Sequence, residues 1–520
     1  MKRHEWLIIF GAAIAALIPF FSRDKPDVSG GFAGDAGIYG DLAQDFYGRW
    51  AEGVNSFYLG RSLPSWLLHH VLHLFTPEPS YHQVLMAFGL LNVVAIALMG
   101  YVWCLVCRRL QITAAGAGLG FIGLFLNHHI LKTSGQSPIR TEFCAYALSL
   151  LLFWVYLQRP GWGRRLGMLA VTIALTFTWP AGIYMCTLLW LFPGWPNHPE
   201  PSPESDPETS DLAHHSVSPP PYKLHYILAL LPTIAGFIYM QALLPGDLDY
   251  LGRGVPLERV GYLSIAIATS YLFVGLSELL RNARFYRWAS GLSYLKSWQF
   301  WVKLLGLAVL FKLPGMLATD GGYPMVVGHV IYLVVLTSIL QPGVFFIAHL
   351  VYYGPLLIFG LFFWRPVCQL LHRYGLGLSL WAALMFVFSL GSESRHIVNF
   401  YPVLVTLIVL ATRSLRQAWK PWHYWVFGGL SLFTSKVWLT IGTRPGDVVS
   451  EPQAFPAQFY FMNHGPWMSN LMYAIQAAIS VVLIYAVYDL WIRGLRPGRA
   501  AIAANPNPPT PTHRDESAGY

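Results

Sequence analysis

Hydrophobic stretches separated by short polar connections run along almost the whole chain. The first covers residues 6–21, directly after Lys2 and Arg3, and no small-x-small cleavage site precedes Ser22. It predicts an uncleaved first transmembrane helix. Further hydrophobic runs lie at 84–107, 113–127, 142–158, 166–194, 224–244, 260–280, 299–317, 343–364, 375–390, 400–412, 422–441 and 470–492.

Two apolar segments are not expected to form a single transmembrane helix each. The run at 166–194 contains Thr-Trp-Pro-Ala-Gly at 178–182, and the alternation of charged connections fits best if two short helices meet there at an outer turn. Residues 326–340 would spoil this alternation as a span, so we expect them to lie flat on the outer surface. The pattern predicts an all-α polytopic membrane protein with about 12–14 transmembrane helices.

The polar segments complete the expected domain organisation. Residues 196–222 and 496–520 are rich in Pro and polar residues and bury too little apolar surface to fold, so we expect a disordered cytoplasmic loop and tail. The remaining parts are the first transmembrane helix (1–22), a first outer loop with amphipathic helices (23–83), transmembrane helices with outer turns (84–195) and transmembrane helices with outer loops (223–495).

Composition and charge support this interpretation. Of 520 residues, 55% are hydrophobic and 11% charged, which excludes a water-soluble fold. The net charge of +9 could indicate nucleic acid, but twenty Lys and Arg fall in the predicted inner connections and ten in the outer ones. The bias predicts cytoplasmic N- and C-termini and contact with membrane lipids, not nucleic acid. Compact loops favour the inner membrane of a bacterial cell over the endoplasmic reticulum.

Cysteine and histidine give little indication of redox or metal chemistry. Cys104 and Cys107 have redox spacing, but they end an apolar helix and are interpreted as small buried residues. The adjacent pairs at 69–70 and 128–129 suit one metal ion poorly and are expected at the surface or membrane interface. No nucleotide-binding or zinc-protease motif occurs. We expect no cofactor; a divalent metal ion has no support from the sequence.

The first outer loop carries the most informative polar residues. Asp35 and Tyr39 are one helical turn apart, and helices are predicted at 36–53 and 62–75, the second preceded by Arg61. An acidic residue just beyond the first span could act as a general base toward an acceptor hydroxyl. The alternative is a helix N-cap. Asp41 and Asp45 are interpreted as a solvated face paired with Arg49.

This arrangement resembles the GT-C class of membrane glycosyltransferases, which includes protein O-mannosyltransferases and aminoarabinose transferases. The resemblance rests on a first span ending outside, the Asp-x-x-x-Tyr helix at 35–39, the Arg-x-x-Pro start of the next helix at 61–64, and many later spans. Members commonly show two consecutive acidic residues where this chain has Asp35 and Ala36. The resemblance implies inverting transfer of a sugar from a polyprenyl-phosphate donor, with Asp35 as base and no carboxylate-bridged metal.

Four later residues could hold the donor phosphate. Arg140 opens an outer end of a span, with pairing to Glu142 or lipid headgroups as the alternative. Arg395 and His396 follow Glu393 in a short outer connection, where Glu393 and Arg395 could instead form a structural pair. Lys436 lies in the outer half of a span and either contacts phosphate or extends toward the interface.

Further residues are candidates for sugar or acceptor binding. Tyr39, Arg61 and Glu393 lie beside the residues above, and the last outer loop places aromatic rings beside polar groups at Tyr460, His464 and Trp467. Ring faces stack on sugar C–H faces, although the same composition is typical of an interfacial aromatic belt.

We therefore expect a membrane glycosyltransferase working at the outer, periplasmic face. Its partners would be a polyprenyl-phosphate sugar donor and a glycan, lipid or protein acceptor. A secondary transporter or lipid-linked oligosaccharide flippase is the alternative from another class, and would require ionisable residues near the middle of the membrane. A polysaccharide polymerase or ligase would share the donor chemistry.

Overall fold

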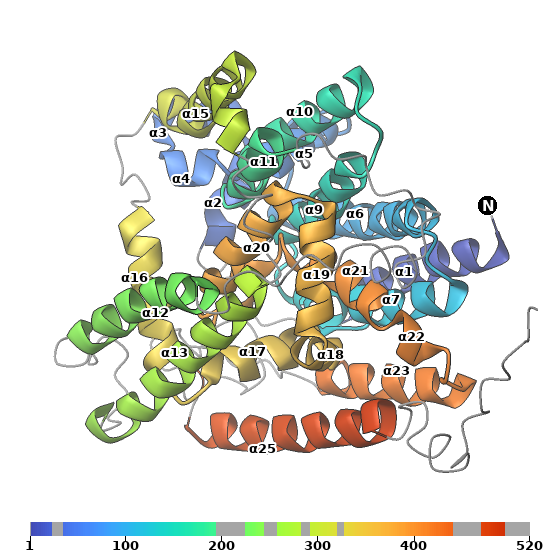
Figure 1. Ribbon diagram of the computed structural model, residues 1–520. Helices are drawn as coiled ribbons and strands as arrows, with labels where there is room; N and C mark the ends of the chain where they lie inside the picture. Colours follow the sequence, from blue (N-terminus) through green and yellow to red (C-terminus); the bar gives the residue numbers. More distant parts are fainter. Residues whose placement is uncertain are drawn as a thin grey trace, which may run out of the picture.

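The computed structural model describes residues 2–22, 35–193, 224–243, 257–281, 292–319, 327–439, 468 and 470–493. Helices joined by turns form this part of the chain, and no strand occurs in it (Figure 1). The expected all-α class is therefore confirmed. Both predicted disordered segments, at 196–222 and 496–520, fall outside the described residues.

The first half of the chain contains twelve described helices, several of them short. In chain order these are α1 (Arg3–Phe21), α2 (Asp35–Gln44), α3 (Phe46–Gly53), α4 (Ser56–Leu59), α5 (Leu63–His73), α6 (Tyr81–Arg109), α7 (Ala114–Phe125), the π-helix η2 (His129–Thr133), α8 (Ser134–Gln136), α9 (Glu142–Tyr156), α10 (Trp162–Thr176) and α11 (Gly182–Leu191).

The second half continues the helical bundle. Its described helices are α12 (Leu224–Leu243), α13 (Leu257–Arg281), η4 (Leu292–Lys296), α15 (Trp298–Leu317), α16 (Val327–Ile339), α17 (Val344–Tyr353), α18 (Leu356–Phe362), α19 (Trp364–Tyr374), α20 (Leu376–Phe388), η5 (Ser394–Ile397), α21 (Tyr401–Ala411), α22 (Arg413–Arg416), α23 (Pro421–Ser435), α25 (Asn470–Val487) and η7 (Tyr488–Arg493).

Six of these helices are long and apolar enough to cross a membrane, or up to seven if the bent pair of α16 and α17 forms one span. Five other apolar helices have only 10–17 residues. At about 1.5 Å per residue, each is shorter than a bilayer core of about 30 Å. The structure therefore supports a helical membrane protein, and its described residues contain fewer helices of full spanning length than the 12–14 transmembrane helices expected.

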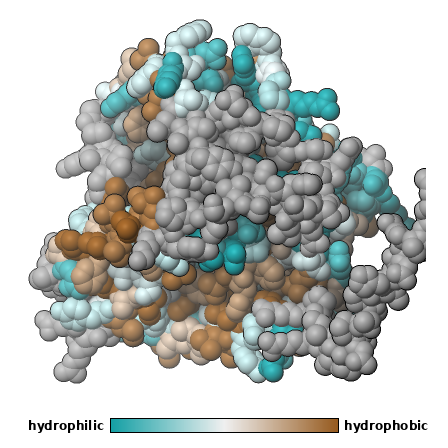
Figure 2. Space-filling view, in the orientation of Figure 1, coloured by the Kyte–Doolittle hydropathy of each residue, from teal (hydrophilic) through white to brown (hydrophobic). Residues whose placement is uncertain are grey.

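The outer helices present their apolar side chains to the surroundings. Only 17% of the hydrophobic window of α12, 17% of that of α15 and 22% of that of the helix at Asn470–Arg493 is buried. Figure 2 shows hydrophobic side chains over the lower part of the molecule and hydrophilic ones mainly along its top. Exposed apolar faces on this scale are what contact with lipid requires.

Local sequence explains where several predicted helices break. The turn at 178–182 separates α10 from α11, as expected. The predicted helix 36–53 is instead two helices, because Asp45 leaves the helical conformation and its side chain accepts the backbone N–H of Gly48 as the N-cap of α3.

The segment expected to lie flat on the outer surface, 326–340, packs against the helical bundle. It forms α16, whose residues Val334, Val335 and Ile339 are buried with α13 in one hydrophobic cluster. The chain then bends by 99° between α16 and α17. Gly343 allows this bend because its φ of 65° is left-handed.

Helix α1 is fixed against α6 at one end and against α8 at the other. Arg108 donates two hydrogen bonds to the buried Glu5 carboxylate, at 2.6 and 2.5 Å. A Cβ atom at Gly135 would collide with the backbone carbonyl of Pro19. These contacts fix the point from which the chain leads toward α2.

Candidate functional site

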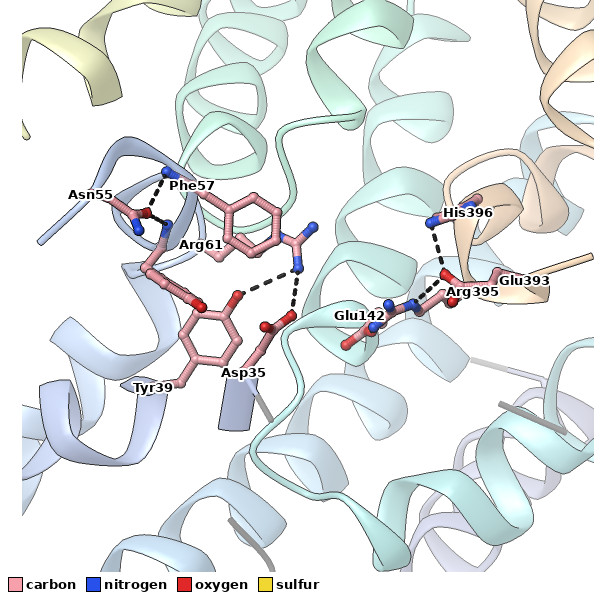
Figure 3. Close-up of polar contacts among 10 residues, drawn as sticks. Asp35, Tyr39, Asn55, Phe57, Arg61, Glu142, Glu393, Arg395 and His396 are labelled. Atoms are coloured by element: carbon pink, nitrogen blue, oxygen red, sulfur yellow. Dashed lines mark hydrogen bonds and ion pairs between the residues drawn. The ribbon is translucent and has the colours of Figure 1, made fainter. Parts of the chain in front are cut away.

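Asp35 is the first residue of α2, and its side chain points toward Arg61. The carboxylate lies 3.6 Å from Arg61, and the side chain is 39% exposed (Figure 3). Within the described part of the chain it accepts no hydrogen bond from a backbone N–H of α2. The N-cap alternative is therefore not seen there, and the carboxylate is held by a cation yet open to solvent or substrate.

Arg61 is held rigidly by aromatic rings on two sides. It follows the short helix α4, which Asn55 caps by accepting the backbone N–H groups of Phe57 and Tyr58. The guanidinium carbon lies 4.1 Å from the Phe57 ring centroid and 4.4 Å from that of Trp179. The side chain is only 11% exposed, so its orientation toward Asp35 is largely fixed.

Tyr39 completes this first group. The ring is buried, and its hydroxyl accepts a 3.4 Å hydrogen bond from Arg61. Burial raises the pKa of the phenol, and the charge of Arg61 opposes part of that rise. Ser65 in α5 donates to the backbone carbonyl of Tyr39, which joins α2 to α5. Tyr39 therefore orients Arg61 and α2 more than it offers a free surface.

A second group surrounds Arg395 in η5. Its guanidinium lies 3.6 Å from Glu142 at the start of α9 and 3.1 Å from Glu393, and His396 lies 3.1 Å from the same Glu393 oxygen. The geometry allows both roles expected for this turn, which are binding of the donor phosphate and a structural ion pair. The structural pairing of Glu393 with Arg395 is present, and Glu142 adds a second carboxylate from another helix.

The two groups face one another across the interior (Figure 3). Burial alone would lower the pKa of Arg395, but the carboxylates of Glu393, Glu142 and Asp35 outweigh it, so the pKa stands above the ordinary arginine value. The positive charge of Arg61, in the first group, also attracts the Glu142 carboxylate in the second group. Together, Asp35, Glu142 and Glu393 alternate with two guanidiniums, so that side chains of opposite charge are neighbours in this array.

Arg140 stands next to this array without being paired within it. Its side chain is half-buried and acts electrostatically on Glu142. Glu142, its expected partner, lies within ion-pair distance of Arg395 instead. No carboxylate among the described residues is within 4.0 Å of the Arg140 guanidinium. Arg140 is therefore the cation of this group best placed to receive an anionic ligand.

Lys436 belongs to a different part of the interior. It terminates α23 in a left-handed conformation and is buried, so its side chain does not extend along the protein surface. Its charge acts on His128, as does that of Lys132, and His128 contacts the carbonyl oxygen of Ser435 at 2.8 Å. No described contact joins Lys436 to Arg395.

Sequence reasoning missed three buried polar residues. Glu142, His128 and His129 all lie inside the bundle, so histidines 128 and 129 are not at the protein surface, one of the two positions expected for them. His129 contacts the Tyr352 hydroxyl at 2.7 Å and stacks on Phe143 at 4.6 Å. Their position in or beside apolar runs was the available signal, because buried polar groups need specific partners.

An apolar pocket of about 190 Å³ lies beside the first group. It opens between helices α3, α4 and α5 and the end of α15, next to the chain segment that carries Arg61. Its lining residues are Phe46, Trp50, Leu59, Ser62, Leu63, Trp66, Phe177 and Leu317.

The other expectations concern residues or ligands that the structure does not place. Tyr460, His464 and Trp467 lie outside the described residues. Within the described ranges, no group of three or more His, Cys, Asp or Glu side chains could hold a metal ion. Cys104 and Cys107 are both buried and unbridged, as predicted.

Comparison with known proteins adds no family to these observations. No protein-family model, curated protein or solved structure matches the chain.

Proposed function

We propose that the protein is an inverting membrane glycosyltransferase that uses a polyprenyl-phosphate-linked sugar as donor. The observation that carries the proposal is the partly exposed Asp35 carboxylate, held by Arg61 and facing the group that contains the Arg395 guanidinium. A base and a phosphate-binding cation at one site are the two groups that this displacement needs.

The proposed reaction is a single displacement. Asp35 takes the proton of the acceptor hydroxyl, whose oxygen then forms a bond to the anomeric carbon. The bond from that carbon to the phosphate oxygen breaks, and polyprenyl phosphate leaves with the electron pair. Arg140 and Arg395 stabilise the phosphate charge, while Arg61 holds Asp35 in position. The configuration of the anomeric carbon inverts.

Two features fit a lipid-linked donor. The apolar pocket lies beside Arg61 and can receive hydrocarbon, and the exposed apolar faces of the bundle support contact with a membrane. No soluble nucleotide site is then needed. The acceptor is a glycan, lipid or protein.

The positive-inside bias supports placing the reaction at the periplasmic face of the inner membrane, with both termini in the cytoplasm. His396 and Glu393 would position Arg395. Lys436 has the weaker case for direct phosphate contact, because its described neighbours are His128 and Lys132.

A deletion strain tests the activity. Mass spectrometry of its envelope glycans and lipids should show loss of one defined sugar, and expression of the wild-type gene should restore that sugar. A profile that is unchanged by the deletion would contradict the proposal.

One observation favours a second candidate, a secondary transporter. His128 and His129 are buried in the bundle near Lys132 and Lys436, and intramembrane ionisable residues commonly mark transport pathways. A transporter would leave the glycans of the deletion strain unchanged while altering uptake or export of a solute.

A further inference from the structure

Arg416 is a buried cation that is not part of the proposed catalytic site. It ends α22, in the connection between α21 and α23, and is 7% exposed. No carboxylate of the described chain lies within ion-pair distance of it. Burial lowers its pKa to about 10, and the neighbouring Arg413 adds to that decrease. A buried charge in this state is costly unless an anion compensates it.

The hydrogen bonds of Arg416 use only part of its guanidinium. Nη1 donates to the carbonyl of Val409 and, at 3.3 Å, to the hydroxyl of Thr412, both at the end of α21. The Nε atom is buried without a partner. A structural role as the C-terminal cap of α21 therefore explains one nitrogen and leaves the other donors unexplained.

The surroundings of Arg416 add positive potential and unused donors. A Cβ atom at Gly116 would lie 2.9 Å from Arg416 Nη2, so the guanidinium packs against the first turn of α7, the positive end of that helix. The Tyr424 hydroxyl, which interacts electrostatically with Arg416, and the Trp419 indole N–H are also buried without partners in the described structure.

The residues around this cluster are typical of a membrane interface. Arg413 and Lys420 are exposed cations, and Trp422 and Trp425 are 45% and 81% exposed. Basic residues beside exposed indoles are the composition that meets anionic lipid headgroups. On the proposed topology, this connection is cytoplasmic.

We propose that Arg416, together with Tyr424 and the first turn of α7, binds the phosphate group of an anionic phospholipid. The ligand supplies the negative charge that the described chain lacks here, and the phosphate oxygens accept from Arg416 Nε and the Tyr424 hydroxyl. Such a lipid would join α7, α22 and α23. This site is independent of the proposed glycosyl transfer.

Thermal unfolding of the full-length protein in non-ionic detergent tests this site. Phosphatidylglycerol should raise the Tm of the wild type, and phosphatidylcholine should raise it less. Arg416→Gln should need roughly tenfold more phosphatidylglycerol for the same shift, because charged hydrogen bonds are lost. The control Arg159→Gln, an exposed arginine in another connection, should follow the wild type.

The outcomes separate the alternatives. Equal lipid titrations for Arg416→Gln and the wild type would overturn the proposal and leave the helix cap as the only role. An equal shift with inorganic phosphate at the same concentration would overturn the lipid as source and assign the site to free phosphate. If Arg416→Gln does not fold, Tyr424→Phe decides: a weakened phosphatidylglycerol response supports the site, and an unchanged one overturns it.

Discussion

Arg61 shows how a single side chain can organise the proposed site. It pairs with Asp35, donates to Tyr39 and lies between two aromatic rings. Arginine can do all of this because its guanidinium is planar and has five donors, whereas a lysine ammonium has neither property. The orientation of Asp35 therefore depends on the shape of residue 61 as well as on its charge.

The variant Arg61→Lys should retain the charge but lose the ring stacking. We expect it to restore the missing sugar of the deletion strain roughly tenfold more slowly than the wild type, normalised to protein in the membrane. Arg49→Lys is the matched control, because Arg49 is 48% exposed and pairs with Asp41 and Glu52. Equal rates for Arg61→Lys and the wild type would show that the stacking has no role.

The short spacing of the first group made it predictable from sequence. Asp35 and Tyr39 are neighbours on one helical turn, so local geometry was enough to place them together. The second group was not predictable in full, because Glu142 reaches Arg395 only through the packing of α9 against the later helices. Arg140 stays a predicted phosphate-binding cation, and Glu142, its expected partner, lies within ion-pair distance of Arg395 instead.

Helix bounds depend on local signals to different extents. Apolar runs indicated most helices, and Pro180 and Gly182 marked the break between α10 and α11. The capping role of Asp45 was missed because an aspartate inside a helical pattern has no distinctive signal. The bend between α16 and α17 also depends on packing against α13, which periodicity cannot show.

Close contact between α1 and α8 should make Gly135 intolerant of a side chain. Gly135→Ala should lower the free energy of unfolding by about 1–3 kcal/mol, because the Cβ meets the backbone of Pro19, which cannot rotate away. Gly118→Ala in α7 has open space around the Cβ and should be neutral or stabilising by about 0.5–1 kcal/mol. Thermal unfolding of the two variants measures both; equal effects would contradict this packing.

The contact between helices α3 and α5 should become less stable in mild acid. His69 Nδ1 accepts the backbone N–H of Phe46 at 3.3 Å, and burial lowers the His69 pKa below 6.5, with His73 and His70 adding to the effect. The folded state then binds fewer protons than the unfolded state. Stability is therefore full above about pH 6.5 and falls as the pH drops below it.

A pH series of Tm values measures this effect. The decrease between pH 7.5 and 5.5 should be smaller for His69→Gln, which keeps an acceptor but cannot titrate. His82→Gln, at an exposed position, should follow the wild type. An undiminished decrease in His69→Gln would assign the acid sensitivity to other groups.

For the molecule as a whole, the proposed periplasmic reaction requires that each connection lies on the expected side of the membrane. In the described part of the chain, six apolar helices are long enough to cross and five shorter ones are not, against the 12–14 transmembrane helices expected from the sequence. Broken helices at Gly and Pro positions are stable in a membrane when neighbouring helices satisfy their polar groups. Charge bias, rather than helix count, is thus the basis for the proposed orientation.

Cysteine labelling of intact cells tests that orientation. A cysteine replacing Glu52, whose side chain is 67% exposed in the first loop, should react with a membrane-impermeant maleimide from outside. One replacing the exposed Arg159 should react only after permeabilisation. The reverse pattern would place Asp35 in the cytoplasm and contradict the proposed periplasmic reaction.

The central claim is that Asp35 is the base of a glycosyl transfer. The most direct measurement is the glycan mass spectrum of the deletion strain expressing Asp35→Asn, compared with Asp41→Asn on the same helix at equal protein levels. Asp41 pairs with Arg49 outside the proposed site and should restore the sugar normally. If Asp35 is the base, Asp35→Asn should lower the rate of sugar transfer by about 100-fold or more. Full restoration by Asp35→Asn would contradict this claim.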